Sequence, residues 1–177
     1  MQVERATRLD LAAILVAYAH GRAVQREQDS PLWPDFPDSA ILAEIDSGSL
    51  FRVLDGDALV GVFTAVYEDP ALWGDLERHA HLYLHRIARA STYAGRGLVD
   101  AVLAWAQARA EEIELEGLRM DTWASNDALI AYYGKRGFAL VGKTRIPGDS
   151  PLPHYRGLEL ALMERPLWAE FQNALKA

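Results

Sequence analysis

Apolar positions near the start of the chain repeat at intervals of three and four residues, which predicts an amphipathic helix. The repeating positions are Leu11, Ile14, Leu15 and Tyr18. Thr7 and Asp10 resemble a capping box, in which a polar side chain inside the first turn bonds the backbone at the helix start. The helix is expected to fade between residues 20 and 28, and a short strand is expected over residues 2–6.

Proline and glycine residues, which interrupt helices and strands, separate the next apolar runs. A loop with three prolines spans residues 29–38, and a second helix with Ile41 and Ile45 on one side follows and ends at Gly48. Strands are expected over residues 50–54 and 58–66, joined as a hairpin by an Asp-Gly-Asp turn. Residues 67–79 are expected to form an irregular connection to a strand over residues 81–89.

Strands and helices alternate in the second half of the chain. The expected elements are a helix after Gly97, a strand over residues 117–122, a helix over 126–136, strands over 138–144 and 157–163, and a terminal helix over 165–175. Three antiparallel strands before a strand–loop–helix–strand unit predict a mixed α/β fold with helices covering the sheet. No linker divides residues 1–177, so a single domain is expected.

Composition and charge narrow the classes of function. The chain has 177 residues, no cysteine and a formal net charge of −7. The lack of cysteine excludes disulfides, thiolate metal sites and cysteine nucleophiles. The acidic balance disfavours a nucleic-acid partner. No run approaches the ~18 apolar residues of a membrane-spanning helix, and the first residues lack a signal-peptide pattern, so we expect a cytoplasmic protein with no membrane partner.

The first segment with chemical character joins a strand to a helix over residues 84–106. Backbone N–H groups at a helix start are unpaired, and glycines allow a phosphate to approach them closely. Gly95 and Gly97 stand where this binding needs them, and Arg96 adds a charged donor. Two other interpretations stay open: an ordinary turn into a helix, and a dinucleotide fingerprint, which would need a small residue in place of Asp100.

A second segment places Asn126 at a helix start, Tyr133 two turns later and Gly137-Phe138 at the helix end. Taken alone, Tyr133 reads as a packing residue. Together, the two segments resemble the GCN5-related N-acetyltransferase (GNAT) superfamily, whose phosphate loop and later N-x6-Y-x3-G-F motif have this spacing. The resemblance implies a mostly antiparallel sheet in which two parallel strands, here residues 81–89 and 117–122, splay apart.

The resemblance also implies a cofactor site for acetyl-CoA, with CoA as the product. The backbone of Ile87, Ala88 and Arg89 would pair with the pantetheine arm like an added strand. The pyrophosphate would rest on the glycine loop, which comprises Ala94, Gly95, Arg96, Gly97, Leu98 and Val99. Ala94 and Val99 depart from the family's pattern at these positions. Asn126 and Tyr133 are expected to complete the cofactor site.

The implied reaction is direct attack of a primary amine on the thioester. Tyr133 is expected to be the general acid that protonates the departing thiolate, since an ordinary tyrosine is protonated at neutral pH. The alternative is that Tyr133 only hydrogen-bonds the sulfur. His85 is the expected base for the amine proton. Glu68 or Asp69 acting through water, and a histidine that merely fills the strand face, are the alternatives for that role.

The acceptor is expected to be a small amine, with a cationic one favoured by the residue types available. In the family, the loop between the first two helices usually lines the acceptor site. In this chain that loop offers Trp33 and Asp35. Trp73 and Trp123 are further candidates for the acceptor site, and Glu68 is expected to face the same site. Aromatic faces and carboxylates hold cationic amines through cation–π contacts and ion pairs. The equally weighted interpretation is that these tryptophans cover the sheet and the acids are solvated.

Three further expectations concern a metal site, an alternative function and a homodimer. No metal is expected, although His79, His81 and His85 share one strand parity. A non-catalytic acyl-CoA-binding or regulatory domain of the same fold is the alternative to an enzyme. Fold analogy allows a homodimer through the late strands.

Overall fold

The computed structural model describes residues 1–93, 95, 97–149 and 155–167. Seven strands form one sheet in the order β1-β2-β3-β4-β5-β7-β6. β4 and β5 pair in parallel, whereas the pairs β1–β2, β2–β3, β5–β7 and β6–β7 are antiparallel. The mixed, mostly antiparallel sheet predicted from the sequence is therefore confirmed, including the parallel pair.

The chain divides into two compact units. Unit 1 comprises residues 1–65 and 85–105, and unit 2 comprises residues 66–84 and 106–177. Strand β4 and helix α4 each contribute residues to both units. Within the described part of the chain, no helix is both long enough and apolar enough to cross a membrane.

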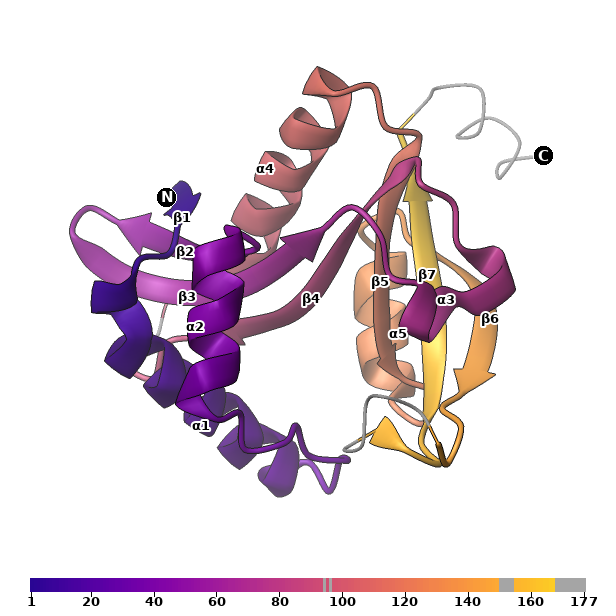
Figure 1. Ribbon diagram of the computed structural model, residues 1–177, viewed down its shortest axis with the longest axis horizontal. Helices are drawn as coiled ribbons and strands as arrows, with labels where there is room; N and C mark the ends of the chain where they lie inside the picture. The colour runs from indigo at the N-terminus through magenta and orange to yellow at the C-terminus, as the bar shows by residue number, and fades with distance from the viewer. Residues whose placement is uncertain (94, 96, 150–154, 168–177) are drawn as a thin grey trace. The chain divides into compact units, whose positions relative to one another are not determined.

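Unit 1 packs two helices on one face of its strands and the start of a third on the other. Its elements are β1 (Gln2–Arg5), the 3₁₀ turn η1 (Arg8–Asp10), α1 (Leu11–Glu27), α2 (Asp38–Ser47), β2 (Leu50–Asp55), β3 (Ala58–Val66), the end of β4 (His81–Arg89) and the start of α4 (Leu98–Glu112). Helices α1 and α2 lie beside strands β2 and β3 (Figure 1). Leu50 and Val62 belong to the same buried cluster as Ile14 and Tyr18 of α1 and Ile41 of α2. Phe51 and Phe63 point to the opposite face and contact Trp105 of α4.

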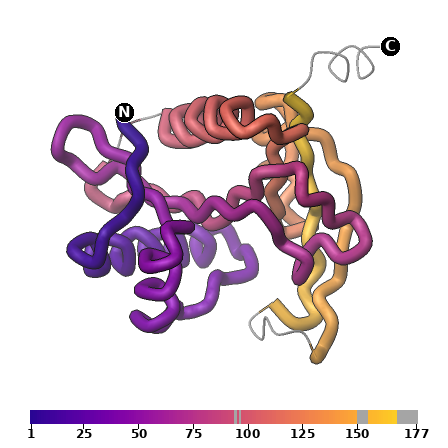
Figure 2. Tube along the Cα trace, turned by 45° about the horizontal axis from the view of Figure 1, so that its top comes forward, coloured from indigo at the N-terminus to yellow at the C-terminus, as the bar shows by residue number. Residues whose placement is uncertain are grey.

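The strands of unit 2 contribute to a small, mostly aromatic core. Its elements are α3 (Pro70–Trp73), η2 (Gly74–Leu76), the start of β4 (His81–Arg89), β5 (Gly117–Trp123), α5 (Asp127–Gly134), β6 (Ala139–Arg145) and β7 (Glu159–Pro166). Trp73, Tyr83 and Leu162 form the core cluster. β6 and β7 run side by side in opposite directions (Figure 2).

Two expected segments differ from the structure. The connection over residues 67–79 contains the short helix α3, because Pro70 fits the first helical position and Asp69 accepts a hydrogen bond from the Leu72 N–H. The terminal helix cannot begin at Arg165, because Arg165 and Pro166 still pair with β5. The remainder of that expected helix, from residue 168, lies outside the described residues.

Candidate active site

The second half of β4 carries the three residues expected to pair with a cofactor. Ala88 is buried, and the N–H of the following Ala90 bonds the Val60 carbonyl of β3. Arg89 is exposed, and its guanidinium donates to the carbonyl of Tyr93 and lies 3.2 Å from His20 Nε2. The Arg89 side chain thus contacts the start of the glycine loop, a role that its position in the sequence did not suggest.

The glycine loop leads directly into α4. Gly97 has a φ of +94°, a conformation that glycine adopts without steric cost, and its carbonyl accepts the Ala101 N–H as the first turn of α4 closes. Leu98 is buried at the start of the helix, whereas Val99 is half-buried. The expected contacts at Ala94 and Arg96 lie outside the described residues. Gly97 and the start of α4 are compatible with a helix-start anion site and equally with a plain turn into a helix.

Gly61 of β3 explains how the helix start can lie close to the sheet. A Cβ at Gly61 would lie 2.6 Å from a methyl carbon of Leu98 and 2.9 Å from the Ala88 carbonyl oxygen. Only a residue without a side chain therefore allows β4 and the first turn of α4 to approach β3 this closely.

Helix α5 begins at Asn126 as expected. The side-chain oxygen of Asn126 accepts the Leu129 N–H at 2.9 Å, which satisfies one of the unpaired donors of the first turn. This bond places one lone pair of the amide oxygen in the helix cap, and the NH₂ group is the donor that Asn126 can offer to a cofactor.

Tyr133 lies at the other end of α5 and is 8% exposed. Its ring packs edge-on against Tyr132 and Phe138, with centroids 5.4 and 6.0 Å away. Burial, with a smaller effect from Tyr132, raises the pKa of Tyr133 above its ordinary value near 10, and Arg136 opposes the rise. The phenol is therefore held in its protonated form, the form a general acid requires.

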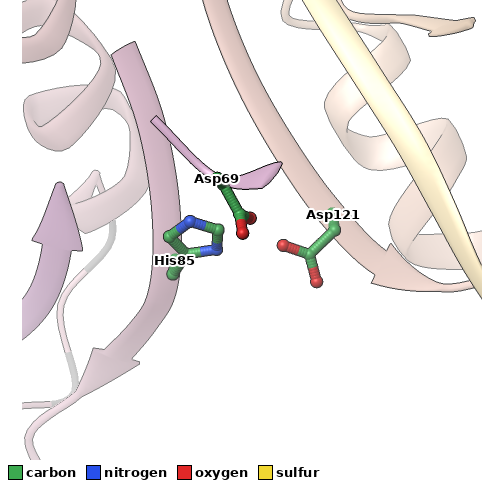
Figure 3. Close-up of side chains that lie close together, drawn as sticks. All are labelled: Asp69, His85 and Asp121. Carbon is green, nitrogen blue, oxygen red and sulfur yellow. The ribbon is translucent and has the colours of Figure 1, made fainter. Parts of the chain in front are cut away.

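Figure 3 shows the side chains of His85 on β4, Asp69 after β3 and Asp121 on β5. Within unit 2, carboxylate oxygens of Asp69 and Asp121 lie within 4.8 Å of each other. His85 is the first residue of unit 1 on β4 and is half-buried. Its role as a base stays a prediction.

The remaining histidines have separate carboxylate neighbours. His79 Nδ1 lies 3.7 Å from Glu68, and both side chains are mostly exposed. His81 is buried, and its Nε2 lies 3.6 Å from Glu164 of β7. Because His79 and His81 have different partners, their shared strand parity does not gather them around one ion.

A hydrogen-bond network that includes the backbone of Asp69 was not predicted from the sequence. Arg119 donates to Tyr83 Oη at 2.9 Å and to Glu164 at 2.8 Å, and Tyr83 donates to Glu77 at 2.6 Å. Glu77 also accepts the backbone N–H of Asp69. Burial and the hydrogen bond to Glu77 raise the pKa of Tyr83 to about 12, so the Tyr83 hydroxyl keeps its proton at neutral pH. The arginine within the apolar run of β5 was the available signal, but Glu77 lies in a loop without periodicity.

The loop between α1 and α2 carries two expected acceptor residues. The Trp33 ring packs edge-on against Tyr18 at 6.0 Å, and its backbone N–H donates to Gln25. Asp35 pairs with Arg22 at 2.9 Å and is 90% exposed at its side chain. A groove of about 570 Å³ lies along this loop. Its lining includes Leu15, Val16, Tyr18, Arg22, Asp35 and Phe36.

Other tryptophans have less open surroundings. Trp123 is 6% exposed and lies 5.7 Å from the Tyr155 ring, whereas Trp73 belongs to the core of unit 2 beneath Arg119. Trp73 therefore covers the sheet, which is the plainer of the two interpretations for it. Trp105 packs in unit 1 against Phe51 and Phe63.

Comparison with known proteins places the chain in a class. Residues 15–138 match the model of the Acetyltransferase (GNAT) family, so this protein belongs to that family. This membership confirms the resemblance carried by the glycine loop and the Asn126–Phe138 motif.

Individual relatives are more distant. The chain is 32% identical over 106 residues to YesJ of Bacillus subtilis (strain 168), an uncharacterized N-acetyltransferase; the match spans 58% of this chain and 59% of that relative. A GNAT-family acetyltransferase structure from Listeria monocytogenes 4b F2365 has a TM-score of 0.72 at 22% identity, covering 94% of each chain. The structure of yncA from Salmonella typhimurium with its cofactor acetyl-CoA has a TM-score of 0.65 at 18% identity, covering 95% of this chain and 94% of that one.

Proposed function

We propose that the protein is an N-acetyltransferase that uses acetyl-CoA and acetylates a primary amine by direct attack on the thioester. The observation that carries this proposal is family membership combined with a buried, protonated tyrosine at the motif position. The cofactor of the Salmonella relative supports acetyl-CoA as the donor.

In the proposed cofactor site, main-chain groups do most of the binding. The backbone of Ile87, Ala88 and Arg89 pairs with the pantetheine arm, and the N–H groups of residues 95–99 hold the pyrophosphate. The positive φ of Gly97 and the adjoining start of α4 suit this binding. Asn126 contributes its amide NH₂ group, because its oxygen caps α5.

The proposed transfer moves one acetyl group and one proton. The lone pair of a neutral amine forms a bond to the carbonyl carbon, and the carbon–sulfur bond breaks. The departing thiolate takes the Tyr133 hydroxyl proton, and the amine proton is lost to His85 and returned through solvent to the tyrosinate. Asp69 or Glu68 acting through water are the alternative bases.

The proposed acceptor is a small amine that binds near carboxylates and aromatic rings. Asp35 and Glu68 have exposed carboxylates, and the half-buried Trp33 supplies a ring face for a cation–π contact. The expected contact with Trp123 is restricted by its burial, since that residue is 6% exposed. No observation favours a nucleic-acid acceptor, given the net charge of −7. The homodimer stays a prediction from fold analogy.

Replacement of Tyr133 by phenylalanine tests the proposed acid while keeping the ring that packs on Phe138. We expect kcat to fall by about 10²-fold or more, because general acid catalysis contributes roughly 10²–10⁴, while acetyl-CoA affinity stays within about threefold. Tyr132→Phe is the matched control, since Tyr132 is the adjacent, more exposed tyrosine. Equal kcat values in wild type and Tyr133→Phe would remove Tyr133 from the acid role.

The alternative function is a non-catalytic acyl-CoA-binding domain. It shares the cofactor site but needs no acid. Acetyl-CoA binding without amine-dependent CoA release, across a broad panel of primary amines, would favour that alternative over the enzyme.

A further inference from the structure

Arg86 has a backbone conformation that its residue type disfavours. Its φ is +51°, in the left-handed region that residues with a Cβ rarely adopt. Two other described residues besides glycine have positive φ, but Asp29 and Glu114 lie just after the ends of α1 and α4, where chains commonly turn this way. Arg86 instead lies inside strand β4, directly before Ile87.

The Arg86 side chain is fixed by groups from three other elements of unit 1. Its Nη2 donates to Glu44 Oε1 of α2 at 2.5 Å and to Thr64 Oγ1 of β3 at 2.9 Å. Its guanidinium carbon lies 4.7 Å from the Phe36 ring centroid and 5.5 Å from that of Tyr18. The Arg86 side chain is 13% exposed, so these contacts are poorly screened by solvent.

These two observations belong together, because a disfavoured backbone conformation persists only where surrounding contacts over-determine it. Arginine has no intrinsic preference for the left-handed region, unlike glycine or asparagine. The ion pair with Glu44 and the ring contacts pull the side chain toward α2 and the α1–α2 loop. Holding the side chain there fixes the backbone at Arg86, and with it the direction of the main-chain groups that follow.

We infer that Arg86 is a positioning residue: its ion pair with Glu44 holds β4 in the left-handed conformation at residue 86 and so orients the backbone of Ile87–Arg89 toward acetyl-CoA. The inference rests on the proposed function, because it assigns a purpose to the proposed cofactor strand. Arg86 itself does not touch the reacting atoms. A plain structural alternative is that the ion pair only attaches α2 to the sheet.

Alanine and glycine at position 86 distinguish these alternatives. Both variants lose every side-chain contact, but only glycine adopts a positive φ without steric cost. We expect calorimetric titration with acetyl-CoA to show Kd raised about tenfold in Arg86→Ala, and at least threefold tighter binding in Arg86→Gly than in Arg86→Ala. If the ion pair only attached α2, Arg86→Gly would bind no more tightly than Arg86→Ala, because both lack the pair.

Two further variants complete the experiment. Arg8→Ala removes a different ion pair to α2, with Asp46, and should leave Kd unchanged. Glu44→Gln keeps the shape of the pair but removes its charge, and should raise Kd at least threefold even if Arg86→Ala does not fold. Wild-type Kd in Glu44→Gln or in Arg86→Ala overturns the inference alone. Absence of acetyl-CoA binding by the wild type overturns the proposed function and the inference with it.

Discussion

At the scale of single residues, the surroundings of Tyr133 set the pKa of its hydroxyl group. Its hydroxyl sits on a ring packed between Tyr132 and Phe138, and burial raises its pKa above the ordinary value. An acid whose pKa is raised stays protonated to higher pH. It is therefore protonated throughout the neutral range, but the same rise makes it a weaker acid toward a departing thiolate, whose thiol has an ordinary pKa of about 8.5.

The raised pKa of Tyr133 predicts the basic side of the pH–rate profile. Because the acid form is retained, we expect kcat not to fall between about pH 7 and about pH 9. The measurement is kcat at saturating acetyl-CoA and amine across this range. A fall in kcat over this interval that is absent from Tyr133→Phe would contradict the assignment.

Local chemistry determined which residues could be predicted from the sequence. The Asn126 cap was predictable because cap preference depends on near neighbours, whereas the expected role of Tyr133 came from the resemblance to the family. Arg86 was not, because its φ is set by contacts with Glu44 and Phe36, 42 and 50 residues away along the chain. The side chain of Arg89 likewise had no expected role until the structure showed its contact with the Tyr93 carbonyl.

At the scale of elements, the helices and strands with clear periodicity were predicted within a few residues. β3 and β4 have the expected bounds, and α2 ends at Gly48, whose φ is +73°. The connection over residues 67–79 was less predictable, because α3 has four residues and depends on the Asp69 cap. The extension of β7 to Pro166 depends on pairing with β5, a partner that is distant in sequence.

Gly61 provides a test of how β3 supports the glycine loop. Gly61→Ala would place a methyl group against Leu98 and the Ala88 carbonyl, and overpacking of this kind costs about 1–3 kcal/mol. We expect a lower free energy of unfolding by denaturant and weaker acetyl-CoA binding, because β4 and the start of α4 must shift. The readouts are urea unfolding and calorimetric titration.

Gly148→Ala is the matched control for Gly61→Ala. No atom lies within 4 Å of the added Cβ at Gly148, so the change in free energy of unfolding should stay within about 0.5 kcal/mol. Unchanged stability and binding in Gly61→Ala would show that β3 does not limit the position of the glycine loop.

At the scale of the whole molecule, charge and burial make stability depend on pH. The surface is acidic overall, with a net charge of −7. His81, by contrast, is buried in unit 2 beside Arg119 and Glu164. Burial, and then the charge of Arg119, lower the pKa of His81; Glu164, Glu116 and the Arg78 backbone oppose them.

The lowered pKa of His81 predicts loss of stability in mild acid. The unfolded chain binds the His81 proton below about pH 6.5, whereas the folded protein resists it, so stability is complete above that pH and falls as pH drops toward the folded value. Urea unfolding at about pH 7.5 and about pH 5.5 measures this change. We expect a smaller change in His81→Gln.

His79→Gln is the control for this comparison, because the His79 side chain is 76% exposed. It should retain the wild-type change in unfolding free energy between the two pH values. An identical change in His81→Gln and wild type would mean that other groups cause the loss in acid.

The central claim is that this protein transfers an acetyl group from acetyl-CoA to a primary amine. The most direct measurement incubates it with acetyl-CoA and a panel of primary amines, cationic ones included, and quantifies released CoA and acetylated amine by mass spectrometry. We predict that at least one amine yields acetylated product in equal amount to the CoA released, with both abolished or strongly reduced in Tyr133→Phe. Acetyl-CoA binding with no acetylated amine from any member of the panel would contradict the claim and favour a non-catalytic acyl-CoA-binding protein.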